Sequence, residues 1–282
     1  NLETYKGRTQ YFVIFEIVKV FSGLGYCIDI IYCNDTKALE EIKNKSFKVI
    51  FGFGETFFLI SQLQKEATTI YYMTENHPDF SFREENKRLE YFYLRHGHKM
   101  PVRRSGSFYK PSHMRVTHSF IITMSETEPL REQYKKPYTI FPTGITNNRY
   151  VFRKKNQEKT RKNFLCLGSA GAIHKGLDLL IDVIANREDI TLHFGGFREE
   201  EKKMLGIPLK SNIIDHGFID IQSESFLKIA DECSFIILLS CSEACSTSIT
   251  TGMLHGLIPV VMKDAGFNRL DKTAIFFEDY KI

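Results

Sequence analysis

The residues best suited to chemistry lie in the stretch FLCLGSAGAIHKGLDLLIDVI, residues 164–184. A buried apolar run passes into Gly168, Ser169 and Gly171, and Lys175 then precedes a second apolar run with helical spacing. A helix start carries unpaired N–H groups and a partial positive charge, so it favours phosphate, and small residues let the backbone approach. Taken alone, the stretch fits an ordinary structural turn better than an anion site.

A second segment of the same kind, SCSEACSTSITTGMLHGLIPVV, spans residues 240–261. It follows the buried run CSFIILLS and also leads into a helix, with Glu243 at the end of the predicted strand. For Glu243, an exposed loop acid and a ligand role are evenly matched, and a Ser/Thr cluster also suits helix capping. The next four residues are small and could bring N–H groups and hydroxyls onto a diphosphate: Ala244, Cys245, Ser246 and Thr247. Two such segments in one half of the chain are harder to explain as turns than either alone.

Short apolar strands alternating with amphipathic helices must position these residues. In the first half we expect a helix at 11–26, strands at 27–33, 48–54, 69–75, 119–125 and 138–144, and short helices at 38–46, 55–67 and 126–136. In the second half we expect strands at 163–169, 190–196, 212–218, 233–240 and 258–263, and helices at 175–187, 198–205, 224–232 and 247–256. Such alternation predicts an α/β fold with parallel sheets covered on both faces.

The chain has 282 residues, which favours two domains of similar size. The polar stretch 149–163 is the best linker, so we expect domains at 1–150 and 151–282. Each should be a Rossmann-like, doubly wound domain, and ligands should bind in the cleft between the carboxyl ends of their strands. The first strand of the first domain is either absent or compressed into the opening residues.

Composition and charge argue against a nucleic-acid-binding, zinc-binding or membrane-spanning protein. The net charge of +4 is too small to indicate nucleic acid, and the six cysteines have no spacing that suits zinc, so we expect no metal site. No apolar run reaches the roughly 18–20 residues that span a bilayer, and no signal peptide is visible, so we expect a cytoplasmic protein. The cationic, acid-free segment 95–115 is either a solvated loop, the narrowly preferred interpretation, or a peripheral contact with the inner face of a membrane.

The pair GSAGAIHKGLDLL and SCSEACSTSITTGMLHGLIPVV resembles the donor-site signature of retaining GT-B glycosyltransferases, the large family 4 group. That group has a glycine turn before a Lys-Gly helix start and, some 70 residues later, a segment of the form SxxEGxGxxxxEAMAxGxPVV. The match covers residues 164–262 well, whereas the first half agrees mainly in layout. The resemblance implies two Rossmann-like domains facing across a cleft and a nucleotide-sugar as substrate, with no cofactor.

Carried over residue by residue, the resemblance assigns Lys175 to the donor diphosphate and Glu243 to the hydroxyls of the transferred sugar. It assigns the loop from Ala244 to Thr247 to the diphosphate, and Gly217 and Phe218 to the nucleotide base. Two departures stand out. Thr251 replaces the second glutamate, which usually binds the ribose, and the arginine that often accompanies the lysine is missing, with Ser169 and Ala170 in its place.

The first half offers one further candidate. His77, in YMTENHPDFSF, leaves the carboxyl end of a predicted strand and either faces the acceptor across the cleft or is a surface histidine before a turn, the slightly favoured interpretation. Gly7 and Arg8 lie where relatives have a glycine-rich acceptor loop.

The leading hypothesis is metal-independent transfer of a sugar, with retention, to an acceptor hydroxyl of a glycan, a polysaccharide or a lipid-linked acceptor. Its catalytic residues would be Lys175, Glu243 and His77. The alternative is a non-catalytic nucleotide- or glycan-binding homologue, as Thr251 and the missing arginine suggest. A nucleotide-sugar epimerase ranks lower, because only His77 and Glu243 could move protons, and nucleic-acid binding ranks lowest.

Overall fold

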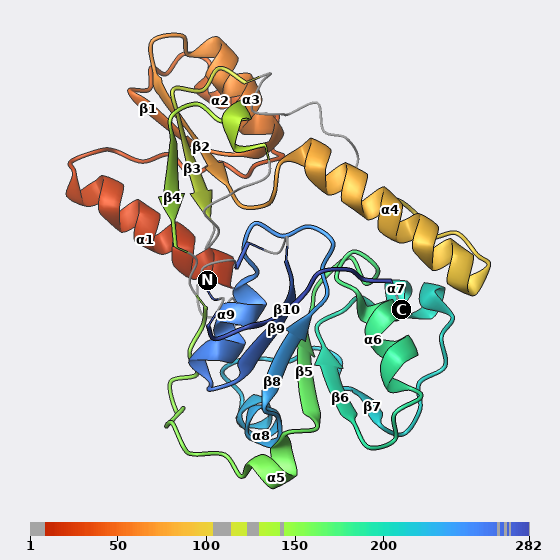
Figure 1. Cartoon of the computed structure of the whole chain (residues 1–282). Coiled ribbons are helices and arrows are strands. Elements are labelled where there is room, and N and C mark those ends of the chain that lie inside the picture. Colours follow the sequence, from red (N-terminus) through yellow and green to blue (C-terminus); the bar gives the residue numbers. More distant parts are fainter. Residues whose placement is uncertain are drawn as a thin grey trace.

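The computed structural model describes residues 9–103, 114–122, 130–141, 144–263, 266–267, 270 and 272–281, and two parallel sheets form its framework (Figure 1). The first sheet has the order β1-β2-β3-β4, formed by Val49–Gly52, Thr68–Met73, His118–Ile122 and Pro137–Ile140. Every pairing in this sheet is parallel. Their carboxyl ends therefore lie at one edge of the sheet.

The second sheet has the order β10-β9-β8-β5-β6-β7, and its pairings are also parallel. The chain enters at β5, runs outward through β6 and β7, and returns to build β8, β9 and β10 on the other side of β5. The strand order thus reverses between β5 and β8, which is where doubly wound sheets bind their ligands. Its strands, in this order, are Ile275–Phe277, Ile258–Met262, Phe235–Leu238, Asn163–Leu167, Thr191–Gly195 and Ile213–Asp215.

The five strands expected in the second half are confirmed, and four of them, β5, β6, β8 and β9, are mostly buried, whereas β7 has only three residues and buries only Ile213. Leu165 and Cys166 on β5 and Ile236 on β8 have no exposed surface and belong to one core cluster. The helices between the strands are confirmed too: α6 (Leu177–Ile184), α7 (Glu199–Leu205), α8 (Glu224–Glu232) and α9 (Thr247–Leu254). The sequence did not predict β10, a short strand whose side chains are exposed or only half-buried.

The first half departs from expectation at residues 27–33. The prediction of a strand there is wrong: in the described part of the chain no strand pairs with this segment, and Ile30 and Tyr32 are 70% and 72% exposed. A β-branched run needs a neighbouring strand and a covered face to be stable as a strand. The remaining elements of this half include α1 (Thr9–Gly23), α2 (Ala38–Ile42), α3 (Gly54–Leu63) and the 3-10 turn η3 (Arg131–Gln133).

The long helix α4 (Pro78–His96) was not predicted from the sequence. Pro78 occupies its first turn, where a missing N–H costs nothing, and Gly97 ends it at a φ of 74°. In Figure 1 this helix leaves the first sheet and passes above α7. Phe92 is fully buried in the core cluster of the second sheet, so the helix joins the two halves.

The segment between the sheets packs on the second one before the polar stretch begins. Ile145 N donates to Thr251 Oγ1 at 3.0 Å, and Asn147 Nδ2 donates to Ile221 O at 2.8 Å. The stretch 149–163 then contains the short helix α5 (Gln157–Thr160). The division into domains at residue 150 stays a prediction.

Some predicted features lie outside the described residues. They are Gly7 and Arg8, any strand within residues 1–8, and positions 104–113 of the segment 95–115. No helix in the described part of the chain is long and apolar enough to cross a membrane.

Candidate functional site

The two segments singled out in the sequence meet where the strand order reverses. Residues 168–176 connect the end of β5 to α6, and residues 239–246 connect the end of β8 to α9. Because β5 and β8 are adjacent and parallel, both connections lie at the same edge of the sheet. This edge is the candidate functional site.

Lys175 and Glu243 form an ion pair across these two connections. Lys175 Nζ lies 2.7 Å from Glu243 Oε1, with side chains only 12% and 16% exposed. Ser240 Oγ donates to the same carboxylate oxygen at 3.1 Å. The structure therefore brings together two residues that stand 68 positions apart in the sequence.

His174, which sequence reasoning missed, ties the two connections together. Its Nε2 donates to Ser242 O at 2.8 Å, and its carbonyl accepts from Cys241 N at 2.8 Å. Burial raises the pKa of the neighbouring Cys241 thiol to about 12, so this cysteine stays protonated and is no nucleophile at neutral pH. His174 is 1% exposed, so its role is to hold the backbone of both connections.

The glycine turn already binds an anionic group of the chain itself. Gly171 N and Ala172 N donate to Glu201 Oε2 at 2.6 and 2.9 Å, and Gly171 has a φ of 95° that favours glycine. Glu201 lies on α7, and only the general amphipathic pattern of that helix marked it in the sequence. These two amides are occupied in this structure, so the predicted diphosphate contacts depend on other groups.

Gly168 and Ser169 begin the same connection but differ in their surroundings. A Cβ on Gly168 would lie 2.2 Å from the ring of Phe197, and Gly168 N donates to Gly195 O at 2.8 Å. Only a glycine fits there without moving the ring. Ser169 is exposed beside it.

The connection after Glu243 is largely buried. Ala244 is 1% exposed and packs in the core cluster of the first sheet, while Cys245 and Ser246 are 8% and 6% exposed. Ser246 is the N-cap residue of α9, and its Oγ lies 2.7 Å from Ser248 Oγ. Thr247 opens the helix. This connection thus touches both halves of the molecule.

The residues matched to ribose and base lie in contrasting environments. Thr251 is 3% exposed, and its hydroxyl accepts the Ile145 N–H, so it anchors the segment between the sheets. A Cβ on Gly144 would lie 2.5 Å from Thr251 N, which shows how closely that segment packs. Phe218, by contrast, is 73% exposed, next to Gly217. An exposed aromatic ring can stack on a base.

His77 lies at the carboxyl end of β2 and is fully buried, not a surface residue. Its Nδ1 accepts from Asp79 N at 3.2 Å and so caps α4, and its ring meets Tyr134 edge-on at 5.8 Å. The adjacent Asn76 Nδ2 donates to Glu243 O at 3.1 Å. His77 is therefore adjacent to Asn76, whose side chain binds the connection 239–246, called the Glu243 loop below.

Helix α4 makes further bonds to this edge of the second sheet. Ser81 Oγ lies 2.8 Å from Ser242 Oγ, and Arg88 Nη2 donates to Leu239 O at 2.9 Å. Arg88 is fully buried, and burial lowers the pKa of its guanidinium. Its guanidinium carbon lies over the ring of Tyr280, 4.3 Å from the centroid. The first half of the chain thus holds the Glu243 loop from several positions.

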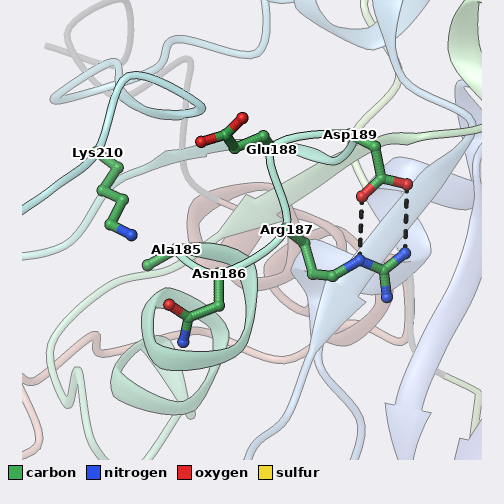
Figure 2. Close-up of a pocket in the computed structure, with 6 residues that line it drawn as sticks. All are labelled: Ala185, Asn186, Arg187, Glu188, Asp189 and Lys210. Carbon is green, nitrogen blue, oxygen red and sulfur yellow. Dashed lines mark hydrogen bonds and ion pairs between the residues drawn. The ribbon is translucent and has the colours of Figure 1, made fainter.

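A shallow hollow of about 470 Å³ lies elsewhere, lined by Ala185, Asn186, Arg187, Glu188, Asp189 and Lys210 (Figure 2). These residues follow α6 or precede β7, at the edge where the strands begin. Figure 2 shows Arg187 turned onto Asp189, with which it forms an exposed ion pair. The hollow is thus at the opposite edge from the candidate site. Within the described residues, no three His, Cys, Asp or Glu side chains are grouped so as to hold a metal ion.

No protein-family model and no curated protein matches the sequence, but solved structures match the fold. S. aureus TarM, solved as a point mutant with Fondaparinux, alpha-GlcNAc-glycerol and UDP, aligns over 86% of this chain and 48% of its own, at 13% identity and a TM-score of 0.57. The sucrose-phosphate synthase of Thermosynechococcus elongatus aligns over 86% and 63%, at 12% identity and a TM-score of 0.60. The lipopolysaccharide outer core galactosyltransferase WaaB aligns over 80% and 59%, at 12% identity and a TM-score of 0.54.

This chain therefore spans about half of TarM and less than two thirds of the other two proteins. The likeness confirms the expected fold class: two Rossmann-like domains of the kind found in GT-B glycosyltransferases. At such low identity the comparison concerns the fold alone.

Proposed function

We propose that this chain transfers a sugar from a nucleotide-sugar donor to an acceptor hydroxyl, as a retaining enzyme of the family 4 type. One observation carries the proposal. Lys175 and Glu243 form a largely buried ion pair between the connections that follow β5 and β8, where the strand order reverses. The motif resemblance and the GT-B fold support the same assignment.

The chemistry requires stabilisation of a leaving nucleoside diphosphate, which gains negative charge as the glycosidic bond breaks. In this proposal Lys175 Nζ donates to the diphosphate and lies beside Glu243, which accepts from a hydroxyl of the transferred sugar. Fixed charges and dipoles stabilise such a transition state strongly, because they need no reorganisation. Transfer needs no metal ion if Lys175 and the N–H groups around it neutralise the negative charge of the diphosphate. Phe218 would stack on the base.

The acceptor would approach from the first sheet. Asn76 holds the Glu243 loop, and His77 stands next to it at the end of β2. The acceptor would be a glycan, a polysaccharide or a lipid-linked sugar. Contact with a membrane through residues 95–115 belongs to the same proposal.

Calorimetry with UDP, GDP, ADP and TDP tests the proposal. We expect one of them to bind, and Lys175→Ala to weaken it at least about tenfold, because a charge-assisted hydrogen bond is lost. Lys210→Ala, at the opposite edge of the sheet, removes the same charge and should bind normally. No heat with any nucleotide, or unchanged binding by Lys175→Ala, would remove the hypothesis.

A second candidate is a non-catalytic homologue that binds a nucleotide or a glycan. The burial of Thr251 and its bond to Ile145 favour it, because this position then supports the fold instead of a ribose. The two candidates differ in turnover. The homologue would bind a nucleoside diphosphate, yet neither hydrolyse nor transfer a nucleotide-sugar across a broad acceptor panel.

A further inference from the structure

The sequence lacks the arginine that often accompanies the lysine at this type of donor site. Ser169 and Ala170 occupy its region, and neither side chain carries a positive charge that would neutralise a phosphate. The amides of Gly171 and Ala172 are taken by Glu201. A diphosphate beside Lys175 would therefore need a second positive charge from elsewhere.

Arg103, from the first half of the chain, lies against this turn. A Cβ built on Gly171 would be 2.6 Å from Arg103 Nη1 and 3.2 Å from Arg103 Cδ. Gly171 O accepts the Lys175 N–H at 2.8 Å. The guanidinium thus lies within one turn of backbone from Lys175.

The path of the chain before Arg103 keeps it there. His98 Nε2 donates to Met204 O at 3.0 Å, at the end of α7, and Met100 packs against the core cluster of the second sheet. These contacts continue the docking of α4 onto the second half. Arg103 follows three residues after Met100, so its backbone is fixed close to the glycine turn.

The charge of Arg103 is available to a ligand. The residue is exposed, and in the described part of the chain its guanidinium makes no hydrogen bond or ion pair. Guanidinium groups bind phosphate well, because their N–H donors match two phosphate oxygens at once. Gly171 has no side chain to separate the guanidinium from the turn.

We propose that Arg103 binds a phosphate of the donor together with Lys175, in place of the arginine missing at residues 169–170. This inference rests on the proposed function, since it concerns the same diphosphate. In this proposal both halves of the chain contribute to the donor site, the first half with Arg103 and the second half with Lys175. It also gives one cation of the segment 95–115 a role in donor binding.

The test compares the binding of a nucleoside diphosphate with the binding of its nucleoside. The pair is UDP and uridine, or the diphosphate that the wild-type protein prefers and its nucleoside. Calorimetry measures the diphosphate, and ligand-observed NMR measures the weaker nucleoside. Arg103→Ala should weaken the binding of the diphosphate by about 10- to 100-fold and leave the binding of the nucleoside unchanged, because only the phosphate contact is lost. Arg103→Lys should restore part of the loss. Arg161→Ala, an exposed arginine before β5 at the opposite edge of the sheet, is the charge-matched control and should bind normally.

Three results would overturn the inference while leaving the proposed function intact: diphosphate binding by Arg103→Ala equal to wild type, an equal loss in Arg161→Ala, or an equal loss for the nucleoside. If the wild-type protein binds no nucleotide at all, the proposed function fails and the inference fails with it.

Discussion

Glu201 shows how a single residue changes the interpretation of a motif. The glycine turn before Lys175 suggested amides open to a phosphate, yet two of them bind a carboxylate from α7. A carboxylate and a phosphate both satisfy N–H donors with negative charge. These two amides therefore bind an anionic side chain of the protein itself, and the binding of a phosphate at this turn stays a prediction.

We expect Glu201→Ala to lower the free energy of unfolding by about 1–3 kcal/mol, because two half-buried amides lose a charged acceptor. Urea denaturation measures the change. Glu200→Ala, an exposed neighbour on the same helix, removes the same charge and should change stability little. Equal stability of the two variants would show that Glu201 does not hold the turn.

Sequence reasoning missed helix α4, which binds the connection after β8 through Ser81 and Arg88. Its apolar positions are sparse, so its periodicity is weak, and His77 and Pro78 suggested a turn instead of a helix start. The structure shows that one face of it is buried on the second half. Arg95 forms ion pairs with Asp178 and Asp182 of α6.

The Arg95 pairing predicts a pH-dependent loss of stability. Burial raises the pKa of Asp178, while Arg88 and Arg95 oppose that rise. A carboxyl whose pKa is raised on folding contributes stability below its unfolded pKa and loses it as pH rises through the folded pKa. Without Arg95 the pKa rises further, so the charged form of Asp178 costs more.

Arg95→Ala should therefore lower the free energy of unfolding by about 3 kcal/mol at about pH 7, and by less at about pH 4, because the raised pKa of Asp178 favours its neutral form as the pH falls. Urea denaturation at the two pH values measures this. Arg83→Ala, on the exposed side of the same helix, is the control. A loss in Arg95→Ala that does not depend on pH would mean that the pairing with Asp178 is not the cause.

At the scale of the molecule, both halves of the chain contribute contacts to the candidate site. The Glu243 loop binds Asn76 and Ser81 from the first half, and Arg103 reaches the turn before Lys175. The binding of a donor should therefore depend on how the halves are docked, and not on the second sheet alone.

The sequence predicted the second half well because its strands are continuous apolar runs bounded by glycines and polar residues. It also placed Lys175 at a helix start and Glu243 at a strand end, and the parallel order of β5 and β8 brings these two residues together. It could not predict Glu201 or Arg103, because nothing local to either residue reveals a contact with a distant turn. The strand at 27–33 failed because pairing, and not composition, decides whether such a run is a strand.

The most direct test of the account is a crystal structure of the protein with its preferred nucleoside diphosphate. We predict that the diphosphate lies between the connections after β5 and β8, with Lys175 Nζ about 2.7–2.9 Å from a phosphate oxygen. A nucleotide bound elsewhere, such as the hollow near Lys210, with the pair of Lys175 and Glu243 untouched, would contradict the account.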